Sequence, residues 1–290
     1  MRVRTLSFAG STFTSRQEYL DYLDGCLASR EKCDLLVFPA LLSLLLAWRF
    51  GELGSPGDLA EAVRALVRLP AAWQDDLAET HRALARGLSV HLVPGTSFTV
   101  EGDRVFQEAC LISPEGEILG SQRQVFLSRE ERQWELSRGE EVPVFATELG
   151  MLGIIVGTDA WYPETGRVLA LQGAEVVCHC GALPAGENCW CQLAGMWAQV
   201  QQNQFFCVES QLAAVIAGRE FAAESLIHAP CEMTAGYTGI VAGGGLSGGP
   251  REAHLDREAR LGVIRQYPLL KLLDPAAYSP LGCRGGGGNS

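Results

Sequence analysis

The sequence has little positive charge. Its 290 residues hold 23 Lys and Arg against 34 Asp and Glu, a net charge of −11. Because nucleic acids and anionic lipid surfaces attract basic protein surfaces, this balance argues against both as partners. The sequence also lacks an apolar run long enough to cross a bilayer, since the longest one, from Leu35 to Trp48, contains Pro39 and Ser43. The N-terminal segment has no long apolar stretch with a cleavage site, so we expect no signal peptide and a cytoplasmic protein.

Internal repeats and interdomain linkers are absent from the sequence as well. With 47% apolar residues, a chain of this length can build one large α/β core. We therefore expect a single domain over residues 1–265, followed by a C-terminal extension over residues 266–290. The final RGGGGNS of that extension is predicted to be disordered because glycine and small polar residues cannot build a core.

Segments typical of strands alternate with segments typical of helices. Residues 33–40 predict a buried strand, and residues 75–98 predict a helix that ends at Gly87 and a strand after it. Two further segments, 104–127 and 142–157, predict pairs of strands joined by tight turns. This mixture of crossovers and hairpins favours a layered α/β sandwich over a doubly wound parallel sheet.

One stretch, GIIVGTDAWYPE at residues 153–164, has the form of a strand that delivers a side chain to a turn before a helix. A nucleophile in such a turn would stand directly after the strand. That position holds Gly157, which has no side chain. The stretch therefore raises the question of whether an active site has lost its reactive atom.

Five segments, taken in order, resemble the nitrilase, or carbon–nitrogen hydrolase, superfamily over about residues 3–245. They are DLLVFPALL, LISPEGEILGSQRQVFLSREE, the segment from Arg138 to Val177, WAQVQQNQFFCVES and FAAESLIHAPCE. The resemblance implies a four-layer αββα sandwich of the nitrilase type, whose members usually dimerise into αββα–αββα, so we expect a homodimer or higher homo-oligomer. It also implies reactions at nitriles, amides and related C–N bonds, with no cofactor.

Members of this superfamily use a Glu, a Lys and a Cys. The thiolate attacks the carbon, the carboxylate moves protons and activates water, and the ammonium stabilises developing negative charge. The resemblance places Ala40, Gln124 and Gly157 at the Glu, Lys and Cys positions, and none of these residues can perform the corresponding role. Glu131 matches an additional carboxylate that some members carry after the lysine.

The triple replacement predicts a catalytically inactive homologue that acts as a binding, regulatory or scaffold protein. By the same resemblance, the pocket is expected to be bordered by Phe38, Thr158, Asp159 and Trp161 and to hold a small-molecule ligand. Thr158 is an alternative nucleophile, but its hydroxyl needs a partner base, and Ala40 removes the obvious one.

A second interpretation is a carbon–nitrogen hydrolase with a rebuilt site that uses a displaced cysteine. Cys178 and Cys180 end a strand that should border the pocket, with His179 between them. In an extended strand the two cysteines point to one face and the histidine to the other. Burial as small apolar residues is the more common state of such cysteines.

A third interpretation is a metal-binding module in the segment CHCGALPAGENCWC. Four thiolates, from Cys178, Cys180, Cys189 and Cys191, could hold zinc tetrahedrally. The C-x-C spacing is less diagnostic of zinc than C-x-x-C, so we expect no metal here.

Overall fold

The computed structural model describes residues 1–27, 32–186, 189–243, 250–274 and 276, with only the backbone at residues 189 and 190. The expectation of a disordered RGGGGNS tail lies outside these residues. No helix in these ranges is both long and apolar enough to cross a membrane.

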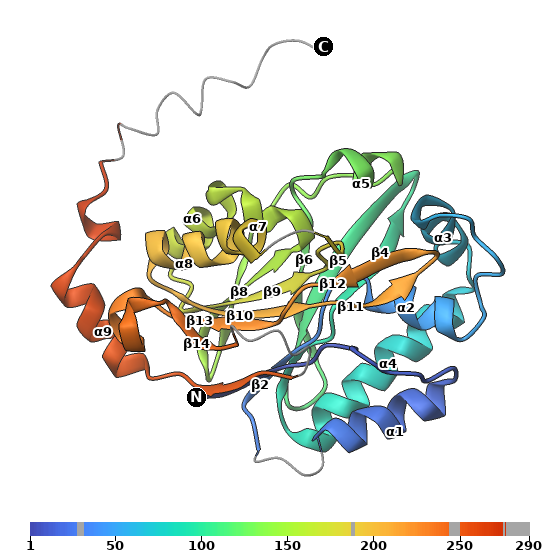
Figure 1. The fold of residues 1–290 in the computed structure, drawn as a ribbon, viewed down its shortest axis with the longest axis horizontal. Coiled ribbons are helices and arrows are strands. Elements are labelled where there is room, and N and C mark those ends of the chain that lie inside the picture. The colour runs from blue at the N-terminus through green and yellow to red at the C-terminus, as the bar shows by residue number, and fades with distance from the viewer. Residues whose placement is uncertain (28–31, 187–188, 244–249, 275, 277–290) are drawn as a thin grey trace.

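Two sheets form the centre of the molecule (Figure 1). In the described residues the first sheet has seven strands, in the order β15-β1-β2-β3-β5-β4 with β6 also paired to β5. Its strands are β15 (Glu252–His254), β1 (Arg2–Thr5), β2 (Leu35–Val37), β3 (His91–Val93), β5 (Arg104–Ile112), β4 (Thr96–Glu101) and β6 (Ile118–Arg123). The second sheet has six, in the order β14 (Ile240–Ala242), β13 (Leu226–His228), β10 (Phe206–Gln211), β9 (Val176–Gly181), β8 (Gly150–Val156) and β7 (Val144–Thr147).

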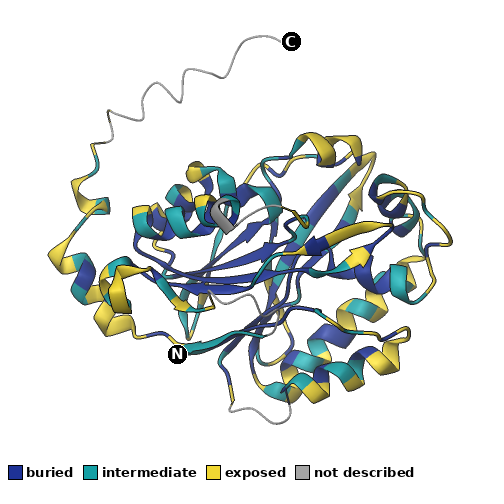
Figure 2. Cartoon of the chain, in the orientation of Figure 1, coloured by how far each residue is buried: buried dark blue, intermediate teal, exposed yellow. Residues whose placement is uncertain are grey.

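Helices cover the outer faces of the sheets, which gives the four layers of an αββα sandwich. Figure 1 shows α1 and α4 on one side and α6 and α8 on the other. The buried residues of Figure 2 lie mainly along the strands between these layers. The helices are α1 (Arg16–Leu27), α2 (Leu42–Arg49), α3 (Leu59–Leu66), α4 (Ala71–Leu88), α5 (Arg129–Gln133), α6 (Pro163–Leu171), α7 (Cys189–Gln192), α8 (Ala198–Asn203) and α9 (Arg257–Gln266).

Shorter elements complete the fold, including a small hairpin of β11 (Ala213–Ile216) and β12 (Arg219–Ala222). The 3-10 turn η1 (Gly157–Trp161) joins β8 to α6, and a π-helical turn, η2 (Leu193–Trp197), joins α7 to α8. Three more 3-10 turns are η3 (Cys231–Met233), η4 (Ala235–Tyr237) and η5 (Leu270–Leu272).

The predicted layered α/β sandwich and its two hairpins are confirmed. Strands β5 and β6 pair antiparallel within residues 104–127, and β7 and β8 do so within residues 142–157. The predicted helix end at Gly87 is wrong: α4 continues to Leu88, and Ser89 takes the left-handed conformation with φ 51°. The Val90 N–H then bonds the Ala85 carbonyl, which closes the helix one turn back.

The helices next to the turn η1 pack through a glycine. A Cβ atom at Gly166 of α6 would overlap Oε1 of Gln199 in α8. The Gln199 amide donates to the Ala160 carbonyl of η1 at 2.6 Å. The close approach of α6 and α8 therefore helps to hold the turn that follows β8.

We predict that Gly166→Ala destabilises the fold by about 1–3 kcal/mol, because the added methyl group overpacks this contact. Gly87→Ala is the matched control: nothing lies within 4 Å of its Cβ position. That variant should gain about 0.5–1 kcal/mol from helix propensity. Urea denaturation measures both, and equal effects of the two substitutions would contradict the packing argument.

Candidate functional site

A cavity of about 310 Å³ opens beside the turn η1. Its walls come from both sheets and from α5, so it lies where several strands end. The polar part of the lining includes Gln107, Glu131, Thr158, His179 and Gln211. The apolar part includes Ala40, Leu41, Leu59, Trp134, Gly157, Trp161, Leu183, Pro184 and Phe221.

The three positions that the resemblance assigns to the triad lie around this cavity. Ala40 and Gly157 line it directly. A Cβ atom built on Gly157 would stand 3.3 Å from Nε2 of Gln124 and 3.5 Å from Oε1 of Glu131. The space that a nucleophilic side chain would occupy is thus bounded by Gln124 and Glu131.

Glu131 stands at the centre of a hydrogen-bonded cluster. Its Oε1 accepts from Nε2 of Gln124 at 3.0 Å, and its Oε2 accepts from the Ser128 N–H at 2.7 Å. Ser128 Oγ accepts from the Glu131 N–H, which completes a capping box at the start of α5. The sequence suggested Glu131 only by resemblance, and its cap motif, S-x-x-E, is the local signal for its position.

Glu131 has no cationic partner in the described part of the chain. The residue is 7% exposed, and all the hydrogen-bond donors to its carboxylate are neutral. Arg129 lines the same cavity but makes no ion pair with Glu131 among the described residues, and neither of the two lysines, Lys32 and Lys271, lines it. A buried carboxylate without a counter-ion is a costly arrangement, which neutral donors offset only in part.

Thr158 lines the cavity beside Glu131 and shares its network. The Thr158 hydroxyl lies 2.9 Å from Glu131 Oε2 and 2.8 Å from the Phe126 carbonyl, and it accepts from Gln124 Nε2 at 2.7 Å. Its single proton serves one of two acceptors at a time. The sequence argument considered only Ala40 as the lost base and missed Glu131 as a carboxylate within reach.

Two residues expected at the pocket are placed elsewhere, whereas Trp161 lines it. Phe38 is fully buried in the core with its ring against Phe8. The Asp159 carboxylate accepts from the backbone N–H groups of Val125 and Phe126 at distances of 2.6 to 3.1 Å. Burial raises the pKa of Asp159 to about 7, against the lowering effect of those bonds. Asp159 therefore ties η1 to the segment after β6 instead of facing the cavity.

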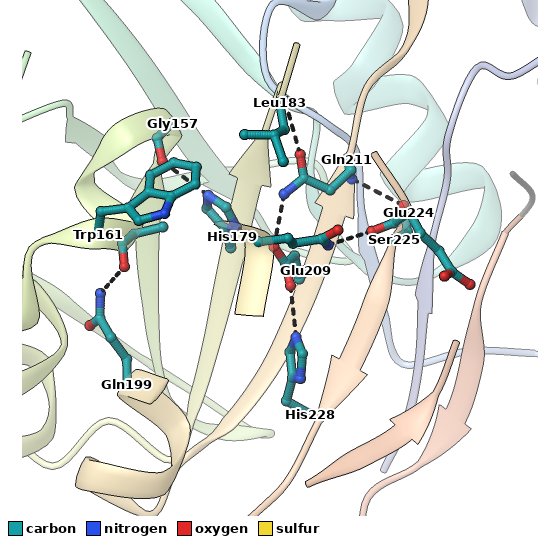
Figure 3. Close-up of polar contacts among 12 residues, drawn as sticks. Gly157, Trp161, His179, Leu183, Gln199, Glu209, Gln211, Glu224, Ser225 and His228 are labelled. Atoms are coloured by element: carbon teal, nitrogen blue, oxygen red, sulfur yellow. Dashed lines mark hydrogen bonds and ion pairs between the residues drawn. The ribbon is translucent and has the colours of Figure 1, made fainter. Parts of the chain in front are cut away.

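A second polar network lies behind the cavity and was not found from the sequence (Figure 3). The Glu209 carboxylate of β10 contacts Nδ1 of His179 at 3.3 Å and Nε2 of His228 at 2.7 Å, and accepts from Gln211 Nε2 at 2.8 Å. Nε2 of His179 lies 3.1 Å from the Gly157 carbonyl oxygen. The network thus joins β9, β10 and β13 to the turn.

The hydrogen-bond partners of His179 determine the net charge of the His179–Glu209 pair. Both ring nitrogens of His179 face oxygen atoms, and the Gly157 carbonyl can only accept. The pair satisfies both contacts only if it holds two protons, which makes its net charge zero. Burial raises the pKa of Glu209, but hydrogen bonds and charge from the two histidines outweigh it and lower the pKa to about 2. Glu209 is therefore held as a carboxylate at neutral pH.

The cysteines of β9 point away from this network. Cys178 and Cys180 are fully buried in the core between the two sheets, and neither lines the cavity. Burial raises the pKa of Cys178 to about 12 and the pKa of Cys180 well above its ordinary value. Both thiols are therefore held in the protonated form, which is a poor nucleophile.

The proposed metal ligands are only partly described. The side chain of Cys189 lies outside the described residues, and Cys191 is partly exposed. Among the side chains that are described, no group of three or more His, Cys, Asp or Glu is arranged to hold a metal ion.

The family model for carbon–nitrogen hydrolases matches residues 11–232. With this match and the αββα fold, the chain belongs to the carbon–nitrogen hydrolase family. Curated relatives include the "Probable hydrolase YhcX" of Bacillus subtilis, 27% identical over 57% of this chain and 30% of its own length. The "Nitrilase" of Pyrococcus abyssi is 27% identical over 51% of this chain and 54% of its own length. The chain thus matches about half or less of these relatives.

Solved structures share the fold over nearly the whole chain. A carbon–nitrogen hydrolase from Helicobacter pylori G27 superimposes with a TM-score of 0.78 at 19% identity, covering 98% of each chain. An amidase from Nesterenkonia sp. superimposes with a TM-score of 0.74 at 22% identity, covering 97% of this chain and 96% of its own. In a variant of the Nesterenkonia sp. AN1 amidase, the acetamide moiety of fluoroacetamide is added covalently at the active-site cysteine.

We predict that Glu209→Gln costs about 3–5 kcal/mol at neutral pH, because it removes the buried carboxylate that both His179 and His228 contact. Glu101→Gln removes an exposed partner of Arg123 and serves as the control, with an expected loss of no more than about 1 kcal/mol. Urea denaturation gives both values. A loss at Glu209 no larger than that at Glu101 would refute the buried ion pair.

The same carboxylate predicts an acid-side dependence of stability. Its pKa falls from an ordinary value of 4.5 to about 2 on folding, so the unfolded chain binds more protons between these values. The Glu209 contribution is therefore complete above about pH 4.5 and is lost as the pH falls towards 2. The difference in unfolding free energy between wild type and Glu209→Gln should shrink over that interval, and a constant difference would argue against the assignment.

Proposed function

We propose that this chain is a carbon–nitrogen hydrolase homologue that binds a small molecule in the cavity beside Gly157 without cleaving it. The observation that carries the proposal is the lack of a side chain at Gly157, whose Cβ position lies close to two polar side chains. These are Gln124 and Glu131, and no thiol lines the cavity among the described side chains. Covalent catalysis of the family type needs a nucleophile at that point, and the backbone alone supplies none.

The charge at the site supports the same proposal. Gln124 has the position of the family lysine and contacts Glu131, but its amide carries no charge. Without an ammonium group, the negative charge that develops on a substrate heteroatom would be unstabilised next to a carboxylate. A pocket with space, aromatic walls and no electrophilic assistance is suited to reversible binding.

The alternative of a displaced cysteine gains no support from the geometry. Cys178 and Cys180 face the core on the side of β9 opposite His179, so their sulfur atoms do not reach the cavity. Thr158 has a better position because its hydroxyl contacts Glu131, but Gln124 and Phe126 also hold it in place. The cytoplasmic homodimer stays a prediction from sequence and family.

We expect the purified protein to release no ammonia from short amides, nitriles or carbamoyl compounds. Thr158→Ala, Cys178→Ser and Cys180→Ser serve to assign any activity that is found. Turnover that one of these three substitutions abolishes would contradict the proposed function and identify the nucleophile. Turnover that none of them abolishes would equally contradict the proposal and point to water activated by another group.

A further inference from the structure

Resting on the proposed function, we propose that the ligand of this cavity is a small primary amine with an apolar body, bound as its ammonium ion against Glu131. The inference names the chemical class of the occupant, which neither the fold nor the family supplies. It rests on the charge of Glu131, on the position of its carboxylate oxygen and on the residues that line the cavity.

Glu131 lacks a cationic counter-ion among the described residues. Glu131 is buried and ionisable, and its donors are the Gln124 amide, the Ser128 N–H and the Thr158 hydroxyl. All three are neutral. A buried carboxylate is most strongly stabilised by a cation in direct contact, and the described chain places none there. A ligand that brings a positive charge would supply this contact.

The position of one Glu131 oxygen shows where a ligand could contact it. Oε1 of Glu131 lies 3.5 Å from the position that a Cβ atom on Gly157 would occupy. The same oxygen accepts a hydrogen bond from Gln124, and a carboxylate oxygen can accept more than one. Gly157 and Glu131 both line the cavity, so the ammonium group of a ligand held there would reach this carboxylate with an N–H donor.

The other ionisable groups near the cavity do not compensate the charge of Glu131. The His179–Glu209 pair is neutral as a unit, so it does not compensate Glu131. At the rim, Glu130 lies 3.7 Å from Arg219 in an exposed ion pair. The buried Asp159 carboxyl is negative or neutral at any pH. Arg129 also lines the cavity, but no ion pair joins it to Glu131 among the described residues. The unpaired charge of Glu131 therefore favours a cationic ligand.

The lining of the cavity determines the shape of the ligand that it can hold. Trp134, Trp161 and Phe221 line the cavity together with Leu59 and Leu183. Aromatic faces attract cations, and apolar walls bind an apolar body through burial. A volume of about 310 Å³ fits a ligand with one ring or a short alkyl chain. A carboxylate of the same shape would meet Glu131 with like charge.

Isothermal titration calorimetry with three matched probes tests the inference: benzylamine, benzamide and benzoate share one ring and differ in charge. At neutral pH, we expect the full chain to bind benzylamine at least about tenfold more tightly than either of the others, since one close charge contact contributes this much. Benzamide or benzoate binding as tightly as benzylamine would overturn the amine assignment. Binding of none of the three would overturn it equally.

Two variants locate the charge contact. Glu131→Gln keeps the capping box, because Gln also fits that motif, and should weaken benzylamine binding at least tenfold while leaving benzamide unchanged. Gln124→Lys places an internal ammonium beside Glu131 and should weaken benzylamine binding to a similar extent. Glu130→Gln removes the same charge at the exposed rim and should change binding less than twofold. Thermal melting confirms that each variant is folded.

The outcomes separate this inference from the proposed function. Ammonia release from benzamide would contradict the proposed function. Unchanged benzylamine binding in both Glu131→Gln and Gln124→Lys would contradict the amine site alone. An effect of Glu130→Gln equal to that of Glu131→Gln would assign the binding to general surface charge and likewise overturn the site.

Discussion

The Glu209 carboxylate is the constraint on which the geometry of this site depends. It stands fully inside the second sheet, on the same side as apolar residues such as Val177 and Cys207. It is stable there because His179 and His228 supply donors from the strands on either side. His179 then reaches the Gly157 carbonyl, so the charge balance inside the sheet also positions the turn. A buried charge of this kind makes the arrangement specific, since losing any one partner leaves another uncompensated.

Around that turn, neutral and backbone hydrogen bonds hold the neighbouring segments together. Gln124 and Thr158 satisfy Glu131 with neutral donors, and Asp159 fastens η1 to the backbone of Val125 and Phe126. The turn therefore needs no catalytic side chain to keep its shape. The cavity beside the turn combines apolar and aromatic walls with polar side chains, among them the buried Glu131 carboxylate.

The local patterns of the sequence predict much of this fold, because strand ends, turns and caps depend on neighbouring residues. The prediction that Gly157, Gln124 and Ala40 lie at one site rests on the resemblance of the segment order to a known family. Their spacing in the sequence does not require it. Alternation along β9 correctly separates His179 from Cys178 and Cys180. Pairing of β10 with β9 and β13 brings Glu209 to its histidines, and such long-range register leaves no local signal. For the same reason Phe38 and Asp159 were expected at a pocket they do not line.

The central claim is that the cavity accepts small molecules but forms no covalent bond with them. A crystal structure after soaking with fluoroacetamide tests this most directly, because the compound is small enough for the cavity and carries an electrophilic carbon. The account predicts no bond between that carbon and any side chain at the cavity. Continuous electron density between that carbon and Thr158, Cys178 or Cys180 would contradict it. Such density would show that hydrolase chemistry has been rebuilt at a new position.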